Sequence, residues 1–359
     1  MYMLCLIPLT LILVVLARAD NRWIEAFFVP FIYRPVSFII GSFVSLFPFS
    51  VTEIAVVILV LLSVWYIVRV IIRIVKEKSA WKHHLYKAFI NVTCVLSVAL
   101  FGFEICMGLN YYRDEAKDYL DLEIKKSTTE ELYDLCVMLA DDLNENRKNC
   151  DVDENGIVKL SDKGWFDTCE SARVAYRKMT KDFPVLKGVD IKNKPLVSSK
   201  LFSMFLTTGI YVPYTFESNI NVDVPEFTIP ATMCHELTHS RGFMREDEAN
   251  FFGYLACTYS ERADFRYSGA YLAFDYAFSE LYDDDINLAK KIAKRLDSGV
   301  IDDITHQSEY WDKYFGTPAA NTSDKVYNTY LEANGEQSGT KSYGEMVDLL
   351  LAYYRKTAK

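Results

Sequence analysis

Long uncharged apolar stretches are confined to the part of this chain that precedes Glu104. Hydrophobic residues make up 51% of the 359 residues, yet the formal net charge is −9, and the acidic excess follows that point. A helix that crosses a bilayer needs about 20 apolar residues, because lipid offers no water to backbone polar groups. The sequence therefore predicts a membrane-embedded region over residues 1–112 and a polar domain over residues 113–359.

About three transmembrane helices are expected in the first region, over residues 1–17, 54–75 and 88–103. The first stretch has no charge, no basic start and no clear cleavage site, which favours an uncleaved helix over a signal peptide. Residues 23–50 are apolar but interrupted by prolines and a glycine, so they are interpreted as interfacial or re-entrant.

The connector between the last two predicted spans is strongly basic. Six Lys and Arg residues between Arg69 and Lys87 oppose only Glu77. Positively charged connectors stay in the cytoplasm, so everything after about Tyr111 is expected on the extracytoplasmic side of a multi-pass membrane protein. Two flanking spans exclude a nucleic-acid role for this basic stretch. Residues 114–126 are charged and are expected to continue the last membrane helix as a solvated stalk.

Three residues of the polar domain form an H-E-x-x-H pattern. His235 and His239 are four residues apart, so on a helix they share one face and both reach one metal ion. Glu236 points toward the edge of that face, where a carboxylate takes a proton from water instead of binding the metal. This pattern is typical of zinc hydrolases, with Zn²⁺ as the cofactor.

The helix that carries this pattern has recognisable ends. Thr228 or Pro230 is expected to begin it, and Gly242 is expected to end it. A second helix is predicted over residues 245–260.

A third metal ligand is expected from the start of that second helix. Glu246, Asp247 and Glu248 all lie within reach of the turn. The spacing of Glu246 and Asn250 resembles the E-x-x-A-D/N element of the gluzincin group of zinc peptidases. The resemblance makes Glu246 the ligand and Asn250 the support of a histidine, with Glu248 as the alternative. Arg245 stands where metzincins have a third histidine, which excludes that group.

The remaining polar domain is predicted to be mainly α, in an α+β fold with a small sheet. Helical spacing of apolar residues or helix-forming composition is found over residues 130–144, 165–179, 272–282, 287–296, 324–334 and 343–354. Alternating Ile, Tyr, Val and Thr between residues 205 and 220 predict short strands. They form either a sheet edge on which a peptide is added as a strand, or a structural hairpin that supports the metal helix.

Other residues are possible donors to a transition state. His306 is the one histidine of the polar domain outside the H-E-x-x-H pattern. Tyr330 and Tyr343 are further candidates, although most such side chains are structural or exposed.

Several segments together resemble a known bacterial family. They are Gly209-Ile-Tyr-Val-Pro, Asn219-Ile-Asn, His235-Glu-Leu-Thr-His-Ser-Arg-Gly-Phe, Glu246-Asp-Glu-Ala-Asn-Phe, Tyr330-Leu-Glu-Ala-Asn-Gly and Ser342-Tyr-Gly-Glu-Met-Val-Asp-Leu-Leu. The family is known as domain of unknown function 3810 and is described as membrane-bound zinc peptidases. The resemblance implies a zincin-like, metal-dependent hydrolase in a bacterial cell membrane, and it implies no substrate.

The sequence hypothesis is thus a membrane-anchored zinc metallopeptidase. It would hydrolyse peptide bonds of a membrane-proximal peptide or protein through a metal-activated water, with Glu236 as general base. Two alternatives remain open: a non-catalytic membrane sensor or assembly protein on a zincin fold, and a cell-envelope amidase.

Overall fold

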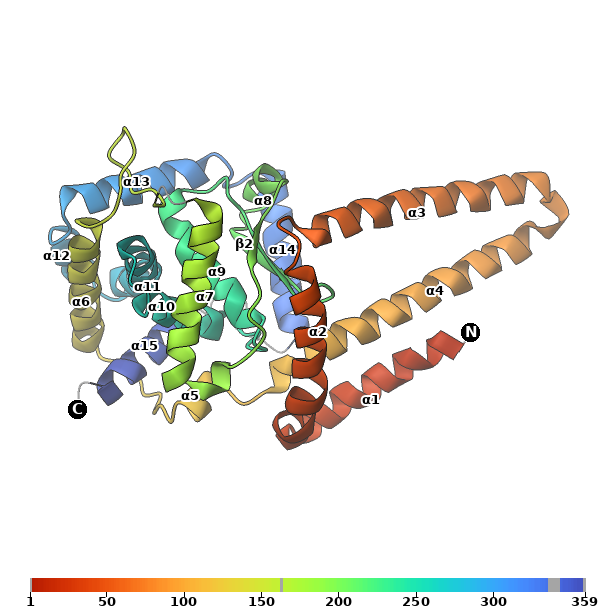
Figure 1. Cartoon of the computed structure of the whole chain (residues 1–359), viewed down its shortest axis with the longest axis horizontal. Coiled ribbons are helices and arrows are strands. Elements are labelled where there is room, and N and C mark those ends of the chain that lie inside the picture. The colour runs from red at the N-terminus through yellow and green to blue at the C-terminus, as the bar shows by residue number, and fades with distance from the viewer. Residues whose placement is uncertain (1, 162–163, 335–342, 358–359) are drawn as a thin grey trace. The chain divides into compact units, whose positions relative to one another are not determined.

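The computed structural model describes residues 2–161, 164–334 and 343–357 (Figure 1). The chain forms two compact units. The N-terminal unit contains the residues up to Arg113 together with Val212–Glu217, and the C-terminal unit contains Asp114–Tyr211 and Ser218 onward. Each unit is described by itself.

The N-terminal unit is built from long apolar helices. Four helical stretches are long and apolar enough to cross a membrane: Tyr2–Ala19, Ile24–Val44, Val51–Lys76 and Lys78–Cys106. They contain the helices α1 (Leu6–Ala19), α2 (Arg34–Val44), α3 (Val51–Lys76) and α4 (Trp81–Cys106), with short 3₁₀ turns at Tyr2–Cys5 and Lys78–Ala80. A further 3₁₀ turn, Gly108–Tyr112, follows α4. Most of their apolar side chains are exposed, as expected for helices whose solvent is lipid.

Residues 23–50 differ from the interfacial or re-entrant interpretation. A π-helical stretch over Ile24–Tyr33 leads directly into α2, so the segment is a fourth candidate span where about three were expected. Pro30 lies inside the π-helical stretch and Pro35 in the first turn of α2. Proline has no N–H to donate, and the wider π-helical turn accommodates the ring and the missing hydrogen bond. Pro30 and Pro35 therefore accompany a change from π-helical to α-helical geometry, and the helix continues through both of them.

Residues Val212–Glu217 are held in the N-terminal unit by the start of α3. The Glu217 carboxylate accepts hydrogen bonds from the backbone N of Val51 (2.9 Å) and of Thr52 (2.7 Å), and from the Thr52 hydroxyl (2.6 Å). The Tyr214 hydroxyl donates to the carbonyl of Ala99 in α4 at 3.0 Å. A carboxylate at a helix N-terminus satisfies N–H groups that have no partner within the helix.

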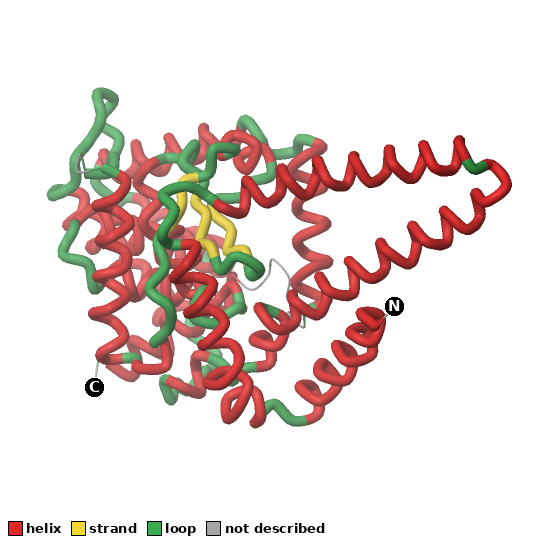
Figure 2. The backbone as a smooth tube through the Cα atoms, turned by 45° about the vertical axis from the view of Figure 1, so that its right-hand side comes forward, coloured by secondary structure: helices red, strands yellow, loops and turns green. Residues whose placement is uncertain are grey.

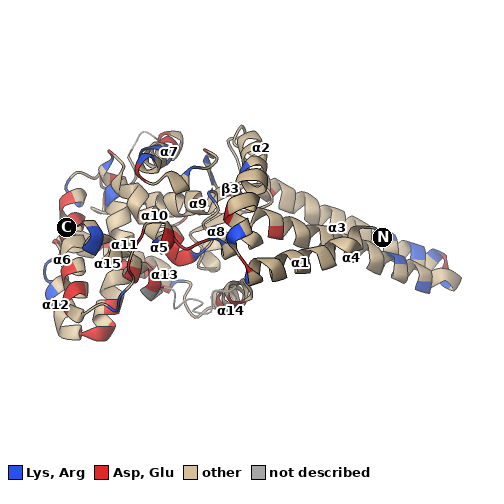
Figure 3. Cartoon of the chain, turned by 90° about the horizontal axis from the view of Figure 1, so that it is seen from below, with Lys and Arg blue, Asp and Glu red and all other residues tan. Residues whose placement is uncertain are grey.

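The turn between α3 and α4 is basic. Figure 3 shows Lys and Arg gathered there, while the rest of both helices is mostly uncharged. Arg73 and Lys76 end α3, and Lys78 and Lys82 begin the next segment. Arg69 lies 5.1 Å from the centre of the Trp65 ring, a cation–π contact.

The C-terminal unit is mostly helical around one hydrophobic core. Its central helices are α9 (Ile229–His239), α10 (Glu246–Thr258) and α11 (Ala263–Asp284), with α6 (Thr129–Arg147) packed along α11. The other helices are α5 (Ala116–Tyr119), α7 (Trp165–Asp182), α8 (Ser199–Met204), α12 (Ile286–Ala293), α13 (Ser298–Asp312), α14 (Pro318–Ala333) and α15 (Tyr343–Thr357), with 3₁₀ turns at Pro184–Leu186 and Glu226–Thr228. Large aromatic side chains fill the core, among them Phe227, Phe251, Phe252 and Phe265.

A small sheet accompanies these helices (Figure 2). Its strands are β1 (Asn193–Pro195), β2 (Gly209–Val212) and β3 (Glu217–Ile220), in the spatial order β1-β3-β2. Strands β1 and β3 are parallel, and Asn193 pairs with Ser218. The predicted mainly helical fold with a small sheet is therefore confirmed, and β2 lies at an edge of that sheet.

The predicted solvated stalk is wrong. Helix α4 ends at Cys106, because Met107 has φ −148° and ψ −57°. The following segment forms only the short helix α5, and Ala116 is completely buried in the core of the C-terminal unit. Its backbone N donates to the Glu248 carboxylate at 2.6 Å. A charged segment of this kind can lie along the surface of a folded domain or form an exposed helix. Its composition alone therefore did not distinguish a packed segment from a solvated stalk.

Candidate metal centre

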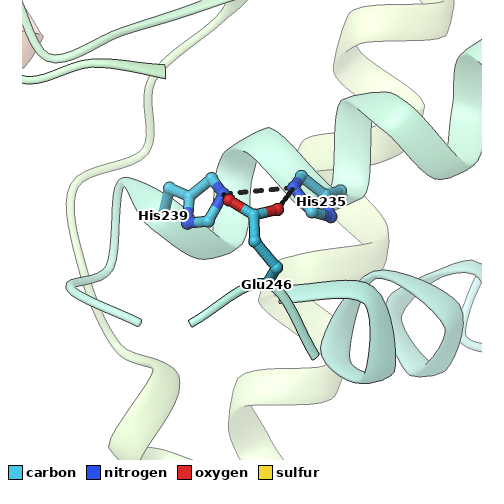
Figure 4. A group of neighbouring side chains, drawn as sticks. All are labelled: His235, His239 and Glu246. Atoms are coloured by element: carbon cyan, nitrogen blue, oxygen red, sulfur yellow. Dashed lines mark hydrogen bonds and ion pairs between the residues drawn. The ribbon is translucent and has the colours of Figure 1, made fainter. Parts of the chain in front are cut away.

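Helix α9 has the ends that the sequence predicts. Pro230 lies in its first turn, where its missing N–H leaves no carbonyl unsatisfied. The helix ends at His239, and Gly242 turns the chain with φ +85°, a conformation that favours glycine. His235 and His239 therefore project from the last helical turn on one face. Their ring centroids are 4.7 Å apart and their Nε2 atoms 3.1 Å apart (Figure 4).

Glu246 completes a three-residue group. It is the first residue of α10, directly after the turn that follows α9. Its Oε2 lies 3.2 Å from His235 Nε2 and its Oε1 lies 3.7 Å from His239 Nε2. The ligand atoms of the three residues all lie within 4.8 Å of one another. In Figure 4 the carboxylate points toward both rings.

The outer nitrogen of each ring is held by a hydrogen bond. His239 Nδ1 lies 2.8 Å from the carbonyl O of Phe243, and a carbonyl only accepts, so this nitrogen carries the hydrogen. His235 Nδ1 lies 2.8 Å from Asn250 Oδ1. The Asn250 amide nitrogen in turn donates to the Tyr276 hydroxyl at 3.1 Å, which assigns Oδ1 as the acceptor for His235. When a ring is neutral, its Nε2 atom then carries a lone pair, and this lone pair faces the other ring.

This geometry fits a divalent cation. When both rings are neutral, the two Nε2 atoms and the carboxylate are all acceptors, and acceptors this close are stabilised by a positive charge between them, which either a proton or a metal ion can supply. Ligands held about 2.0–2.1 Å from a tetrahedral zinc ion lie about 3.3 Å apart. The two Nε2 atoms are 3.1 Å apart, and each lies 3.2 or 3.7 Å from one of the two Glu246 oxygens, distances close to that value. Two histidines and one glutamate are also the protein ligands of one common type of catalytic zinc site.

The pKa values of the three side chains show how closely they interact. Burial disfavours the charged His235 ring, but the hydrogen bond and charge of Glu246 outweigh this and raise its pKa to about 9. Burial lowers the pKa of His239 to about 4. Burial also disfavours the Glu246 carboxylate, but the hydrogen bond from His235 and the nearby ring charges lower its pKa to about 2. Without a metal, these three side chains therefore hold one proton, on Nε2 of His235. A metal ion would have to displace this proton in order to bind.

Glu236 lies beside this group and is 4% exposed. Burial raises the pKa of its carboxyl group to about 8, and the charge of His235, with a smaller contribution from a hydrogen bond to the backbone of Tyr211, partly offsets the effect. Its Oε2 has no hydrogen-bond partner within the described part of the chain. With this pKa the group is mostly protonated at neutral pH in the metal-free chain, and a cation bound nearby would lower the pKa and favour the carboxylate. One oxygen held by a backbone N–H and the other unused then suit the group to exchange a proton with a reactant.

The residue that makes room for Glu236 is Gly209 in β2. A Cβ atom there would lie 2.6 Å from Glu236 Oε1 and 2.8 Å from Thr232 Cγ2. Sequence reasoning did not identify Gly209 or Tyr211 as part of the site. Their position in a predicted strand directly before the H-E-x-x-H helix was the one available signal.

Glu248, the alternative third ligand, lies elsewhere. It is two residues beyond Glu246 on α10, so its side chain leaves the helix in another direction. It is buried and accepts the hydrogen bond from the backbone N of Ala116. Glu248 thus contacts the first residues of the C-terminal unit. The acid that lies beside the two histidines is Glu246.

The three candidate donors have different positions. Among the described residues, His306 on α13 lies outside the group of His235, His239 and Glu246. Tyr343 begins α15, and its side chain lies outside the described part of the chain. Tyr330 on α14 stacks on Tyr327, with ring centroids 6.5 Å apart. Tyr327, one turn earlier, is near enough to Glu246 to contribute to the lowered pKa of its carboxyl group, after the larger effects of burial and the two histidines.

Comparison with protein families gives one match, which covers both units and the whole site. The family is described as "Protein of unknown function (DUF3810)", and its profile matches residues 28–351. No curated protein and no solved structure matches the chain. Because the match spans most of the chain, this protein belongs to the DUF3810 family.

Proposed function

We propose that this protein is a membrane-anchored zinc metallopeptidase with a zincin-like site. The observation that carries the proposal is the set of three acceptor atoms from His235, His239 and Glu246 beside a buried, half-satisfied Glu236 carboxylate. A site that only stabilises a fold has no use for such a carboxylate, whereas a hydrolase needs a general base next to its metal.

The roles of the residues follow from their positions. His235, His239 and Glu246 would hold the ion, with Asn250 and the Phe243 carbonyl orienting the two rings. Zinc supplies positive charge that acidifies water and polarises a carbonyl group. Glu236 accepts the proton of the attacking water and delivers it to the departing amine. Its raised pKa, caused by burial, favours the second half of that exchange at neutral pH.

An extended peptide is the substrate that best suits the surroundings of Glu236. Strand β2 lies at an edge of the sheet, and its Tyr211 backbone contacts the Glu236 carboxylate. Edge strands offer unpaired backbone groups to which a peptide can be added as a further strand. A peptide added beside β2 would pass the general base.

The membrane helices provide the expected location. Connectors rich in Lys and Arg stay in the cytoplasm, and the turn between α3 and α4 is the basic connector of this chain. After α4 the chain would emerge on the extracytoplasmic side, together with the metal centre. An enzyme tethered by its own helices is confined near the bilayer, so its substrates would be membrane-proximal proteins or peptides.

The test uses the full-length chain purified in detergent and loaded with zinc. Glu236→Gln keeps the shape of the side chain but cannot act as a base. We expect it to retain wild-type zinc content and to lose cleavage of a peptide library, read by mass spectrometry. Glu309→Gln, an exposed acid on α13, is the matched control and should behave as wild type. Wild-type cleavage by Glu236→Gln would refute the mechanism, and cleavage of cell-wall amides in place of peptides would change the substrate class.

A further inference from the structure

Six basic side chains surround the turn that joins α3 to α4, and we call them the basic cluster. They are Arg69, Arg73 and Lys76 on α3, Lys78 in the turn, and Lys82 and Lys87 on α4. All six are exposed, and Figure 3 shows Lys and Arg gathered at this end of two helices that are otherwise mostly uncharged. The cluster is therefore a concentrated positive surface.

The protein itself supplies little negative charge to this surface. Within residues 2–161, 164–334 and 343–357, none of the six side chains forms an ion pair. The one acid between Arg69 and Lys87 is Glu77, and its carboxylate lies 2.7 Å from Nε2 of His84 instead. By contrast, Arg113 of the same unit is paired with Glu25 at 2.7 Å. A positive surface without its own counter-charge attracts anions from outside the chain.

The lengths of the uncharged segments place the cluster at the level of lipid headgroups. Residues 54–68 of α3 and 88–103 of α4 carry no charge, and as helices they are about 22 and 24 Å long. The hydrocarbon core of a bilayer is about 30 Å thick, so Arg69 and Lys87, which directly adjoin these segments, lie close to its boundary. Long basic side chains at such positions extend toward the headgroups.

Two tryptophans lie beside the cluster. Trp65 on α3 is 55% exposed, and Trp81 on α4 is 44% exposed. Arg69 lies 5.1 Å from the centre of the Trp65 ring, and Nζ of Lys82 lies 5.7 Å from the centre of the Trp81 ring. Tryptophan is enriched where hydrocarbon meets headgroups, and a cation–π contact keeps a basic group beside the ring. Each helix thus contributes a basic group paired with a residue typical of the membrane boundary.

We propose that the basic cluster binds the phosphate groups of anionic phospholipids in the bilayer that α3 and α4 cross. Arg69, Arg73 and Lys76 are spaced by four and three residues, so they lie on one face of α3. Ile72 is three residues from Arg69 and four from Lys76, and its side chain is 47% exposed, so it offers contact to an acyl chain beside the bound phosphate. Basic clusters next to transmembrane helices attract anionic lipids in this way. The proposal does not depend on the metal centre.

The first test needs only the wild type. The full-length chain in detergent is mixed with equal amounts of phosphatidylglycerol, which is anionic, and phosphatidylcholine, which is zwitterionic, and the retained lipids are counted by native mass spectrometry. We expect phosphatidylglycerol to be retained in preference. The preference should weaken from 0.1 M to 1 M ammonium acetate, because the screening length falls from about 10 Å to about 3 Å. Inorganic phosphate should not displace the lipid, because it has no acyl chain. Equal retention of the two lipids, or displacement by inorganic phosphate, would overturn the proposal.

The second test removes the charge from one face of α3. Each basic group near an anionic surface contributes about five-fold in affinity, so Arg69→Gln/Arg73→Gln/Lys76→Gln should retain phosphatidylglycerol at least about 10-fold more weakly. Arg69→Lys/Arg73→Lys keeps the charge and should keep the preference. Wild-type retention by the glutamine variant would overturn the proposal. Equal loss in the lysine variant would overturn its electrostatic basis.

The matched control removes the same charge elsewhere. Lys290, Lys291 and Lys294 are three exposed lysines at α12 in the C-terminal unit. Their combined replacement by glutamine should leave the preference for phosphatidylglycerol at the wild-type level. A loss as large as that of the α3 variant would show that net charge and not the basic cluster selects the lipid, which would overturn the site. Zinc plays no part in these measurements, so their result stands apart from that of the metal centre.

Discussion

Replacing Gly209 with alanine should disable the general base without disturbing the metal ligands. The added Cβ would lie 2.6 Å from Glu236 Oε1, whereas ordinary contacts begin near 3.4 Å, so the carboxylate must move by about 0.8 Å (3.4 − 2.6). A misplacement of about 1 Å at a catalytic group can lower the rate about 100-fold. We therefore expect turnover to fall by about 30- to 100-fold. Overpacking of this kind also costs about 1–3 kcal/mol of stability.

The assay compares turnover number, KM and zinc content in full-length protein, with a peptide substrate selected from a library. Turnover should fall while zinc content stays at the wild-type level, because Glu236 is not among the metal ligands. Gly102→Ala is the control, since a Cβ there would lie 3.4 Å from the Tyr214 ring, an ordinary contact. Thermal unfolding separates the loss of turnover from a loss of folding.

Full turnover in folded, zinc-loaded Gly209→Ala would refute the reasoning. It would mean that the base tolerates displacement or that Glu236 is not the base. Loss of zinc in the same variant would be equally damaging, because it would show that β2 supports the metal ligands and not the carboxylate beside them.

Three further outcomes are expected. Zinc must displace the proton that Glu246 holds on His235, so zinc affinity should rise about 10-fold per pH unit up to about pH 9, measured by chelator competition; a flat profile would contradict this. Asn250→Ala removes the partner of His235 Nδ1 and should weaken zinc binding about 10- to 100-fold, with Asn250→Asp retaining most of it. Glu217→Ala leaves the start of α3 without its acceptor and should lower stability by about 2 kcal/mol in detergent, with partial recovery in Glu217→Gln; unchanged thermal unfolding would refute its role.

The part of the site that depends on local sequence was predictable. Pro230 and Gly242 mark the ends of α9, and the spacing of four places both histidines on one face. These properties are set within one or two helical turns, so they do not depend on the remaining fold. The same holds for the membrane helices that contain no proline.

The residues that tertiary packing brings to the site carry weaker signals in the sequence. Glu246 was preferred to Glu248 on its spacing to Asn250, but the choice depends on how the turn after α9 enters α10, since a shift of two residues in that entry would bring Glu248 to the place of Glu246. Tyr327 and Gly209 reach the site through tertiary packing, for which neither the helical pattern of residues 324–334 nor the strand pattern of residues 205–220 carries a signal. The continuous helical stretch over residues 24–44 was not anticipated for another reason. Their prolines were interpreted as breaks, although a π-helical turn accommodates one of them.

The most direct test of the central claim is the zinc content of the full-length wild type, Glu246→Ala and Glu248→Ala, measured by mass spectrometry after dialysis. The wild type and Glu248→Ala should each hold about one zinc ion per chain, and Glu246→Ala should hold almost none. Equal zinc content in Glu246→Ala and the wild type, or a wild type without zinc, would contradict the metal centre formed by His235, His239 and Glu246.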